Sequence, residues 1–327
     1  MKQLFTLSLL SFSFAPTNGA PSLSCGTDLC FASGLSSGAV LQQSPASAVL
    51  YGSVNKNSPS GSAVTVFLNA SDRSTSQIFH GVVATDGTWR VQLSPQSVGG
   101  NYSVKATCEA CAGVKTATIS DLTFGDVFYC GGQSNMWLPL WFTFARNATT
   151  IKVLNGSYSN IRLWRGGLGQ VSAPGGGSGN WVGPAGPEPG SDSGDALNNQ
   201  WRHPYDVAFN NEIRPGEPWF WEFPSTCWYT AQFLTDLIGP TAPPMGLMTT
   251  PVGGTMLEEW SSPETQKMIK NVTCMCMDDK TCNPYKPLDA TCTKNSDLYW
   301  GNVQPFVNIT IKSWWWCECH FSPRYIC

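Results

Sequence analysis

The chain has 327 residues, of which 42% are hydrophobic and 13% are charged, and its formal net charge at pH 7 is -3. This length is sufficient for two hydrophobic cores, because single domains usually contain roughly 100–200 residues. The weakly acidic balance argues against nucleic acid as the main partner, since binding to phosphates requires a basic surface. The 32 glycines and 23 prolines indicate many loops, and the 14 tryptophans include candidates for lining a carbohydrate cleft, although most tryptophans lie in cores.

The first 20 residues have the pattern of a secretory signal peptide. Lys2 gives a positive start, an apolar stretch runs from Leu4 to Phe14, and small residues follow at positions 17, 19 and 20. The apolar stretch is shorter than the ~20 residues that span a bilayer, and no later stretch is long enough. The sequence therefore predicts cleavage near residue 20 and a secreted or lumenal protein, extracellular or lysosome-like, with no membrane span.

Thirteen cysteines fit an oxidising compartment, where disulfides persist. Cys25–Cys30 and Cys108–Cys111 are candidates for local bridges by their spacing, and the odd number leaves at least one thiol unpaired or paired between chains. The Cys-Met-Cys motif at residues 274–276 fits disulfides better than zinc, because paired zinc ligands usually have two to four residues between them and this motif has one. Six sequons also indicate secretion and predict N-glycans at Asn69, Asn101, Asn147, Asn155, Asn271 and Asn308.

Residues 21–122 have the pattern of a small β-sandwich. Short apolar runs at residues 63–68, 88–93 and 102–106 alternate with clusters of turn residues about every ten positions. We therefore expect an N-terminal β-sandwich-like accessory domain here. His80 is the one imidazole in this part, and a structural or surface role is expected for it.

From residue 123 the pattern changes to that of an α/β domain. Residues 122–130 and 160–165 predict strands, and residues 166–199 predict a Gly-, Pro- and Ser-rich surface insertion that cannot bury a core of its own. Residues 245–250 predict a buried strand, and residues 302–311 predict one more. Strands alternating with a helix, with glycines at the strand ends, predict ligand binding at the carboxyl ends of the strands.

A helix is expected directly before the strand at residues 245–250. Ser225 and Thr226 are candidates to cap its start, and Gly239-Pro240 predict its end. Its apolar side is expected to carry Cys227, Trp228, Ala231, Leu234 and Ile238, which recur at helical spacing.

The stretch FYCGGQSNMW, residues 128 to 137, places Ser134 directly after an expected strand that ends in two glycines. A nucleophilic serine requires a base and hydrogen-bond donors for the oxyanion that its attack creates. At a strand end its hydroxyl is exposed, and its own N–H can point the same way. Gly253 and Gly254 follow another strand and can supply a second donor, because glycine lets the backbone approach a ligand closely. A plain turn between two elements is the alternative interpretation.

Residues 125–137, GDVFYCGGQSNMW, resemble the first block of the sialate O-acetylesterases and related carbohydrate acetylesterases of the SGNH-hydrolase superfamily. The resemblance continues over residues 31–52 and over residues 225–262, where the chain is similar to a Gly-Gly-Thr-x-x-Glu-x-Trp block. It implies a flavodoxin-like α/β/α three-layer sandwich at residues 123–312 with the accessory β-domain at residues 21–122. The segment at residues 166–199 and an atypical tail at residues 313–327 lie outside the resemblance.

Each site residue implied by the resemblance falls within these matching blocks. Ser134 is the implied nucleophile and the first oxyanion donor through its own N–H. The pair Gly253-Gly254 holds the implied second donor, with Gly254 favoured, and Gln133 and Asn135 are expected to shape the turn around the serine. The implied reaction is hydrolysis of O-acetyl esters of sialic acids or related sugars, with no cofactor and no metal. Two further matching residues carry no implied catalytic role, Glu258 and Trp260.

The chain departs from the family pattern after residue 312. The family continues with a Trp-Tyr-Gln-Gly-Glu-Asn-like block and, further on, an Asp-x-x-His pair that supplies the base and its orienting group. Here the sequence reads SWWWCECHF, and none of the three histidines, His80, His203 and His320, stands in an Asp-x-x-His. We therefore expect a truncated, mis-spliced or frame-shifted sequence and an incomplete sandwich. A genuine Trp-rich end that fills the core is the alternative.

Three functions are consistent with these motifs. The first is a serine esterase that acts through Ser134 on acetylated sugars. The second is a catalytically inactive secreted glycoprotein that binds acetylated glycans, because the Asp-x-x-His segment is missing. The third is a cysteine-rich structural or adhesive protein in which the Gln-Ser-Asn motif is coincidental, and the order and separation of the motifs argue against it.

Overall fold

The computed structural model describes residues 28–32, 34–72, 75–166, 200–209, 212–214, 216–253, 255, 257–268 and 298–317. The strands in these ranges are β1 (Cys30–Phe31), β2 (Val40–Gln42), β3 (Val49–Ser53), β4 (Ala63–Ala70), β5 (Ser76–Val82), β6 (Thr88–Gln92), β7 (Gly99–Thr107), β8 (Thr116–Gly132), β9 (Ile161–Arg165), β10 (Trp201–Arg202), β11 (Glu212–Arg214), β12 (Glu217–Pro218), β13 (Met245–Thr249) and β14 (Ser313–Cys317). The α-helices are α1 (Ser134–Trp137), α2 (Arg146–Leu154), α3 (Pro204–Phe209), α4 (Ser225–Ile238) and α5 (Pro263–Met268). Short 3-10 turns are η1 (Leu140–Phe142), η2 (Trp219–Glu222), η3 (Gly239–Thr241), η4 (Leu257–Trp260) and η7 (Gln304–Phe306), and η6 (Tyr299–Val303) is a π-helical turn.

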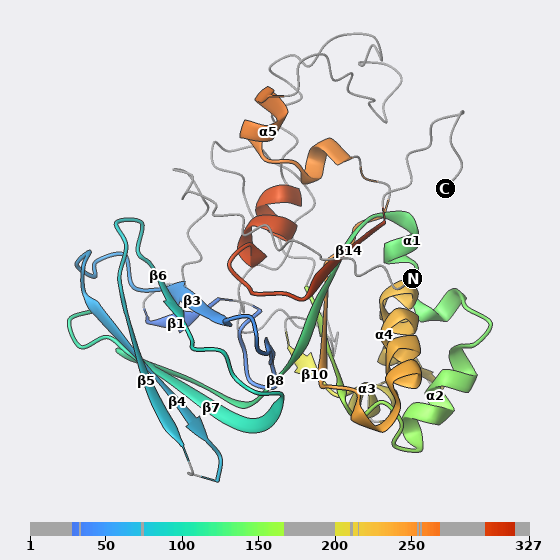
Figure 1. Ribbon diagram of the computed structural model, residues 1–327. Helices are drawn as coiled ribbons and strands as arrows, with labels where there is room; N and C mark the ends of the chain where they lie inside the picture. Colours follow the sequence, from blue (N-terminus) through green and yellow to red (C-terminus); the bar gives the residue numbers. More distant parts are fainter. Residues whose placement is uncertain are drawn as a thin grey trace, which may run out of the picture.

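One long strand, β8, runs through both halves of the molecule (Figure 1). Its first half pairs with β7 in antiparallel fashion, and its second half pairs in parallel with β13 and β14. The large mixed sheet has the order β10-β9-β13-β8-β7-β4-β5, and β14 and β2 also pair with β8. The fold is therefore mixed α/β, as predicted. The domain boundary expected between residues 122 and 123 falls inside β8, and the division into domains stays a prediction.

In the N-terminal half, strands occur where the sequence predicts them. β4 and β7 cover the predicted apolar runs at residues 63–68 and 102–106, and β6 covers the run at residues 88–93 except for its last residue. Val64, Val66 and Leu68 of β4 are buried while their neighbours are more exposed, which is the alternation typical of a strand with one buried face. These residues share one hydrophobic core with Leu50 of β3 and Trp89 of β6, which belong to the separate sheet β1-β3-β6.

In the C-terminal half, the parallel strands are buried on both faces. Phe128 and Cys130 of β8 belong to the core that packs under α4, whereas Val127 and Tyr129 belong to the core shared with the N-terminal strands. Figure 1 shows α2, α3 and α4 gathered on one side of the sheet. The predicted strands at residues 122–130, 160–165 and 245–250 are confirmed, and their continuous apolar character follows from burial on both faces.

Helix α4 begins and ends where predicted, but its capping differs from the prediction. Pro224 occupies the cap position and no side chain caps the helix. The Ser225 hydroxyl donates to the Leu138 carbonyl at 2.8 Å, and the Thr226 hydroxyl donates to the Asn135 carbonyl at 3.1 Å. The capping prediction is wrong because carbonyls of the α1 segment lie within reach, and the two hydroxyls hold that segment against α4.

The apolar side of α4 is buried over its first half. Cys227, Trp228 and Ala231 are fully buried, Leu234 is half-buried, and Ile238 is 44% exposed. The prediction that Ile238 faces the core is therefore wrong, because this last residue of the helix lies outside the core cluster that contains Cys227, Trp228 and Ala231.

The prediction of a strand at residues 302–311 is wrong. Residues 299–306 form the π-helical turn η6 followed by η7. Pro305 has no N–H to donate to a ladder, which disfavours a central strand. Phe306 is buried and packs against Tyr129 and Trp164, so the apolar residues of this segment fill the core from a loop.

The Trp-rich segment that follows forms a partly buried strand of the large sheet. β14 lies parallel to β8, with Ser313 opposite Phe128 and Cys317 opposite Gly132. Trp314 packs on Tyr129 and Trp315 stacks on Phe128, one on each face of the sheet. The part of the expected tail at residues 313–317 thus belongs to the central sheet.

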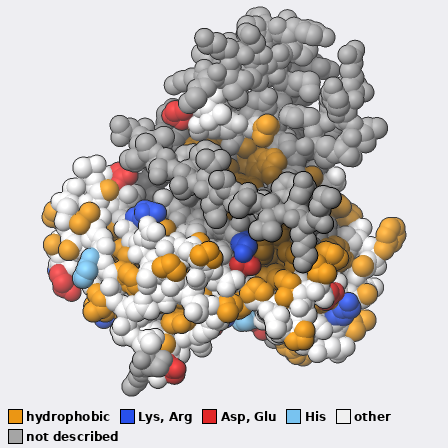
Figure 2. Space-filling view, in the orientation of Figure 1, with side chains coloured by type: hydrophobic (Ala, Val, Ile, Leu, Met, Phe, Trp, Pro, Cys, Tyr) orange, Lys and Arg blue, Asp and Glu red, His pale blue; other side chains and the backbone are white. Residues whose placement is uncertain are grey.

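The surface of the described residues carries few charges, and Figure 2 shows its acidic and basic side chains dispersed singly or in small groups over the visible face. None of the helices in the described ranges has the length and apolar character needed to cross a bilayer. Several predictions fall outside the described residues: the signal peptide, Cys25, the insertion after Gly166, the Cys-Met-Cys motif, Asn271 and His320.

Candidate active site

The carboxyl ends of β8, β9 and β13 meet at one edge of the sheet, since the three strands are parallel. Beyond these ends, the Val252 N–H donates to the Gly132 carbonyl at 3.0 Å, and the Thr250 N–H donates to the Cys130 carbonyl at 3.4 Å. These bonds hold the loop that contains Gly253 against the end of β8. The structure therefore brings the Ser134 turn and the Gly253 loop side by side.

Ser134 begins α1 in an unusual backbone conformation. Its φ is 28°, in the left-handed region that non-glycine residues rarely adopt. Gly132, two residues earlier, has φ 117°, and a Cβ there would collide with the carbonyl oxygen of Cys317 on β14. Only glycine fits at this position, so the second glycine of the motif is required for β14 to pass beside the turn.

The turn is held from both sides by its amide neighbours. Gln133 is 4% exposed, its N–H donates to the Cys317 carbonyl at 2.9 Å, and its side-chain oxygen accepts a short hydrogen bond from the Ser134 hydroxyl. Asn135 is exposed, and its carbonyl accepts the Thr226 hydroxyl of α4. Gln133 and Asn135 thus lie where they can shape the turn, and both make further contacts.

At this edge the backbone N–H groups of Ser134 and of Gly253, which lies in an exposed turn, have no acceptor within the described part of the chain. Oxyanion binding requires such donors, aimed at one point and not used by the protein itself. Gly254, the glycine favoured by the sequence, lies outside the described residues.

A buried polar network supports the loop after β13. The Tyr129 hydroxyl contacts the Thr250 hydroxyl and donates to the Asn302 carbonyl, and the Asn302 amide donates to the Thr250 carbonyl at 2.9 Å. Burial raises the pKa of Tyr129 above its ordinary value, so its hydroxyl keeps its proton. The network ties β8, the β13 loop and η6 together. Sequence reasoning missed Asn302, because it assigned that residue to a strand.

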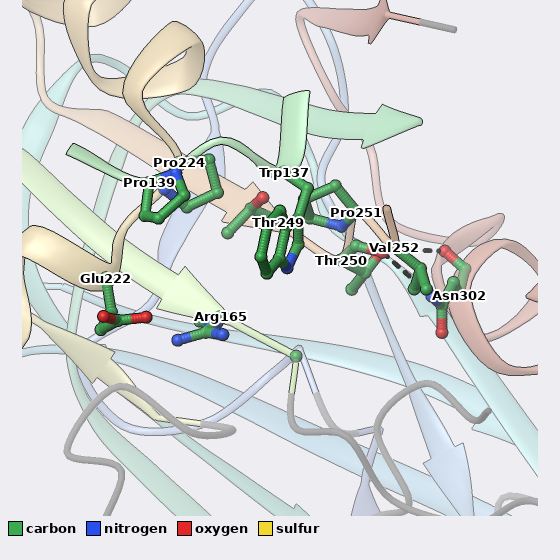
Figure 3. Close-up of a pocket in the computed structure, with 11 residues that line it drawn as sticks. Trp137, Pro139, Arg165, Glu222, Pro224, Thr249, Thr250, Pro251, Val252 and Asn302 are labelled. Atoms are coloured by element: carbon green, nitrogen blue, oxygen red, sulfur yellow. Dashed lines mark hydrogen bonds between the residues drawn. The ribbon is translucent and has the colours of Figure 1, made fainter. Parts of the chain in front are cut away.

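A pocket lies beside this edge, between α1, η2 and the ends of β9 and β13. Figure 3 shows Trp137 near its centre, with the carboxylate of Glu222 and the guanidinium of Arg165 pointing toward one another. Ser134 is not among its lining residues, but Trp137 is one turn further along α1. The lining residues are Trp137, Pro139, Arg165, Gly166, Glu222, Pro224, Thr249, Thr250, Pro251, Val252 and Asn302.

Neither described histidine lies at this edge of the sheet. His80 is on β5 in the N-terminal half, where its ring is 3.5 Å from the Thr65 hydroxyl. His203 follows β10, which is antiparallel to β9 with Arg202 opposite Leu163, so the chain there runs toward the amino end of β9. The carboxyl edge therefore receives no imidazole from either residue.

The two further residues of the matching block are Trp260 and Glu258, and the structure describes the side chain of Trp260 only. Trp260 is 4% exposed, its indole N–H donates to the Thr255 hydroxyl at 2.9 Å, and its ring contacts Trp316 of β14 edge to face. It therefore has a packing role between the loop and β14. The side chain of Glu258 lies outside the described residues.

The fold and this edge define the class of protein: a mixed α/β protein with a serine turn and a glycine loop at the carboxyl ends of parallel strands. A carbohydrate acetylesterase from Xanthomonas citri has a similar solved structure, with a TM-score of 0.54 and 18% sequence identity over 89% of this chain and 51% of that chain. This likeness concerns the fold.

The sequence is similar to curated sialate O-acetylesterases, which confirms the predicted resemblance. The protein from Homo sapiens is 28% identical over 302 residues, 92% of this chain and 50% of the relative. The protein from Mus musculus is 26% identical over 323 residues, 93% of this chain and 54% of the relative. The chain thus spans about half the length of the curated relatives that it matches. No protein-family model matches it.

Proposed function

We propose that this chain is a serine esterase, or part of one, that hydrolyses O-acetyl esters of sialic acids or related sugars. The observation that carries the proposal is the contact between the Ser134 turn and the Gly253 loop, which is fixed by the bond from Val252 to Gly132. The similarity to proteins named sialate O-acetylesterases supports the same reaction class.

In this reaction the Ser134 oxygen attacks the acetyl carbonyl carbon. The oxyanion that forms accepts hydrogen bonds from the Ser134 N–H and from the N–H of Gly253 or Gly254. The bond between the acetyl carbonyl carbon and the sugar oxygen then breaks, and the sugar oxygen leaves with a proton. A water molecule then hydrolyses the acetyl-serine and releases acetate. The serine proton must pass to a base during the attack.

A second candidate function is favoured by the hydrogen bond of Ser134. Its hydroxyl donates to the amide oxygen of Gln133, which accepts a hydrogen bond but is not a base that can take up the proton. A chain that keeps this arrangement would bind acetylated glycans without hydrolysing them.

The proposal also includes the details of the fold, the cellular compartment and the N-glycans. The fold is proposed to be a flavodoxin-like SGNH-hydrolase sandwich with a β-sandwich-like accessory domain. The protein is proposed to be a secreted or lumenal glycoprotein. Four of the predicted sequon asparagines are exposed, as attachment of a glycan requires: Asn101, Asn147, Asn155 and Asn308.

Hydrolysis of p-nitrophenyl acetate and of an O-acetylated sialic acid tests the proposal. We expect Ser134→Ala to reduce kcat/KM by about 10³-fold or more, as loss of a nucleophile does in serine hydrolases. Ser120→Ala, an exposed serine at the far end of β8, is the matched control and should leave the rate unchanged. Equal rates for the parent chain and Ser134→Ala would reject the esterase and leave the binding function.

A further inference from the structure

We infer that the pocket beside α1 holds the sugar ring of the ligand, with Trp137 as its stacking wall and Glu222 as the acceptor for its hydroxyl groups. The inference rests on the proposed function, because it places the ring of the same molecule whose acetyl group reaches Ser134. It adds the residues that recognise the sugar, none of which takes part in the acyl-transfer step.

Trp137 differs from most tryptophans of the chain in its exposure. Its side chain is 45% exposed, whereas Trp89, Trp164 and Trp228 are at most 1% exposed. A methyl group placed on Gly253 would lie 3.5 Å from the Trp137 ring, so the ring already rests against the Gly253 loop. One side of the indole therefore lies against the loop while part of the ring stays open. An open aromatic face in a pocket suits the apolar C–H face of a sugar ring.

Glu222 supplies the polar side of the pocket. Its side chain is half-buried at the end of η2 and forms no hydrogen bond or ion pair with another described residue. A carboxylate has about four acceptor sites, which match the adjacent hydroxyl donors of a sugar. Arg165, at the end of β9, points toward Glu222 and brings a positive charge to the same side of the pocket (Figure 3).

The chain places this pocket within reach of the serine. Trp137 is three residues after Ser134 on α1, and its ring lies against the Gly253 loop, which the structure places beside the serine turn. A ring stacked on Trp137 can therefore present an acetylated hydroxyl to Ser134. Pro139, Pro224 and Pro251 form part of the remaining wall, and their fixed φ angles keep it rigid.

Isothermal titration calorimetry on the full chain tests the inference. The Ser134→Ala background prevents consumption of the ligand, and the probes are O-acetylated N-acetylneuraminic acid and acetylated methyl glucoside. We expect Trp137→Ala and Glu222→Gln each to raise the Kd for the bound sugar roughly tenfold, the size of effect that truncation of a central contact produces. Trp137→Phe keeps an aromatic face and should give a smaller loss.

Matched controls lie outside the pocket. Phe144→Ala removes a fully exposed aromatic ring, and Glu109→Gln neutralises an exposed carboxylate in the N-terminal half. Both should leave the Kd unchanged, and circular dichroism should show all variants folded alike. Tighter binding of the sialic acid probe than of the methyl glucoside probe would indicate an acidic ligand, since Arg165 makes this side of the pocket positive.

The outcomes separate this inference from the esterase proposal. Unchanged affinity in both Trp137→Ala and Glu222→Gln would overturn the pocket assignment, and so would a parent chain that binds neither sugar. Sugar binding that depends on Trp137 and Glu222, in a chain without Ser134-dependent hydrolysis, would support the pocket while rejecting the esterase.

Discussion

At the scale of single residues, the turn around Ser134 is held by its neighbours against its own backbone preference. A left-handed conformation for a serine costs on the order of 1 kcal/mol or more, and it persists only where surrounding contacts determine it. Here the contacts are the bond from the Gln133 N–H to β14 and the bond from the Thr226 hydroxyl of α4 to Asn135. The motif predicts the serine, and only the packed neighbours explain its conformation.

The burial of Tyr129 predicts that the stability of the protein depends on pH in the alkaline range. Burial raises the pKa of Tyr129, and likewise that of Tyr51, above the ordinary tyrosine value near 10. Above pH ~10 the unfolded chain loses these protons while the folded chain keeps them, so the unfolded state binds fewer protons and stability falls as pH rises. The stability that these groups give is complete below pH ~10 and is lost above it.

We therefore expect the free energy of unfolding to fall above pH ~10 by up to about 1.4 kcal/mol per pH unit for each buried tyrosine. Tyr129→Phe should make this fall less steep, and at pH 7 it should cost about 1 kcal/mol because its buried hydrogen bonds are lost. Urea unfolding at a series of pH values measures both effects. Tyr205→Phe, at an exposed ring on α3, is the control at pH 7. An identical alkaline slope in Tyr129→Phe and the parent would contradict the prediction.

At the scale of elements, a disulfide joins the end of β8 to α4. Cys130 is bonded to Cys227 across a sequence separation of 97, and Cys130 lies four residues before Ser134. Cys108 and Cys111 are bonded as their spacing predicts, and Cys317 is the free thiol among the described residues. The long-range bridge fixes the strand end that carries the serine to the helix that holds α1.

The two bridges give a matched pair of variants. In the chain-entropy account, a bridge that closes a loop of ~100 residues stabilises a protein by up to about 4.7 kcal/mol, and one that closes a short loop stabilises it much less. The double variant Cys130→Ala/Cys227→Ala should therefore lower the free energy of unfolding by about 2–5 kcal/mol. Cys108→Ala/Cys111→Ala should lower it by a clearly smaller amount in the same chemical denaturation experiment. Equal losses of unfolding free energy in the two double variants would show that the Cys130–Cys227 bridge stabilises the protein no more than the Cys108–Cys111 bridge does.

At the scale of the whole molecule, β8 makes the two halves one structural unit. The strand contributes Leu122 and Phe124 to the N-terminal core and Phe128 and Cys130 to the core under α4. Arg162 of β9 adds a second connection, because its guanidinium donates to the Gly38 carbonyl at 2.7 Å and pairs with Asp121 at 3.1 Å. Unfolding of one half would thus remove a strand from the other.

We expect one cooperative thermal transition for the whole chain as a consequence. Differential scanning calorimetry should give a calorimetric enthalpy equal to the van't Hoff enthalpy, which is the test of a two-state transition. Two resolved transitions would instead indicate that the halves on either side of residue 122 unfold independently, as separate domains do.

Several local features of the fold can be predicted from the pattern of neighbouring residues alone. The alternation in β4, the apolar strands β9 and β13, the limits of α4 and the serine after two glycines all follow from short-range pattern. Tertiary structure is needed to explain why residues 302–311 are not a strand and residues 313–317 are one, because Ser313 pairs with Phe128, which is 185 positions earlier in the chain. The same holds for the pocket, since Trp137, Arg165 and Glu222 come from three elements and meet only when the sheet forms. Both strand assignments and the pocket depend on long-range pairing and burial, which no local residue spacing encodes.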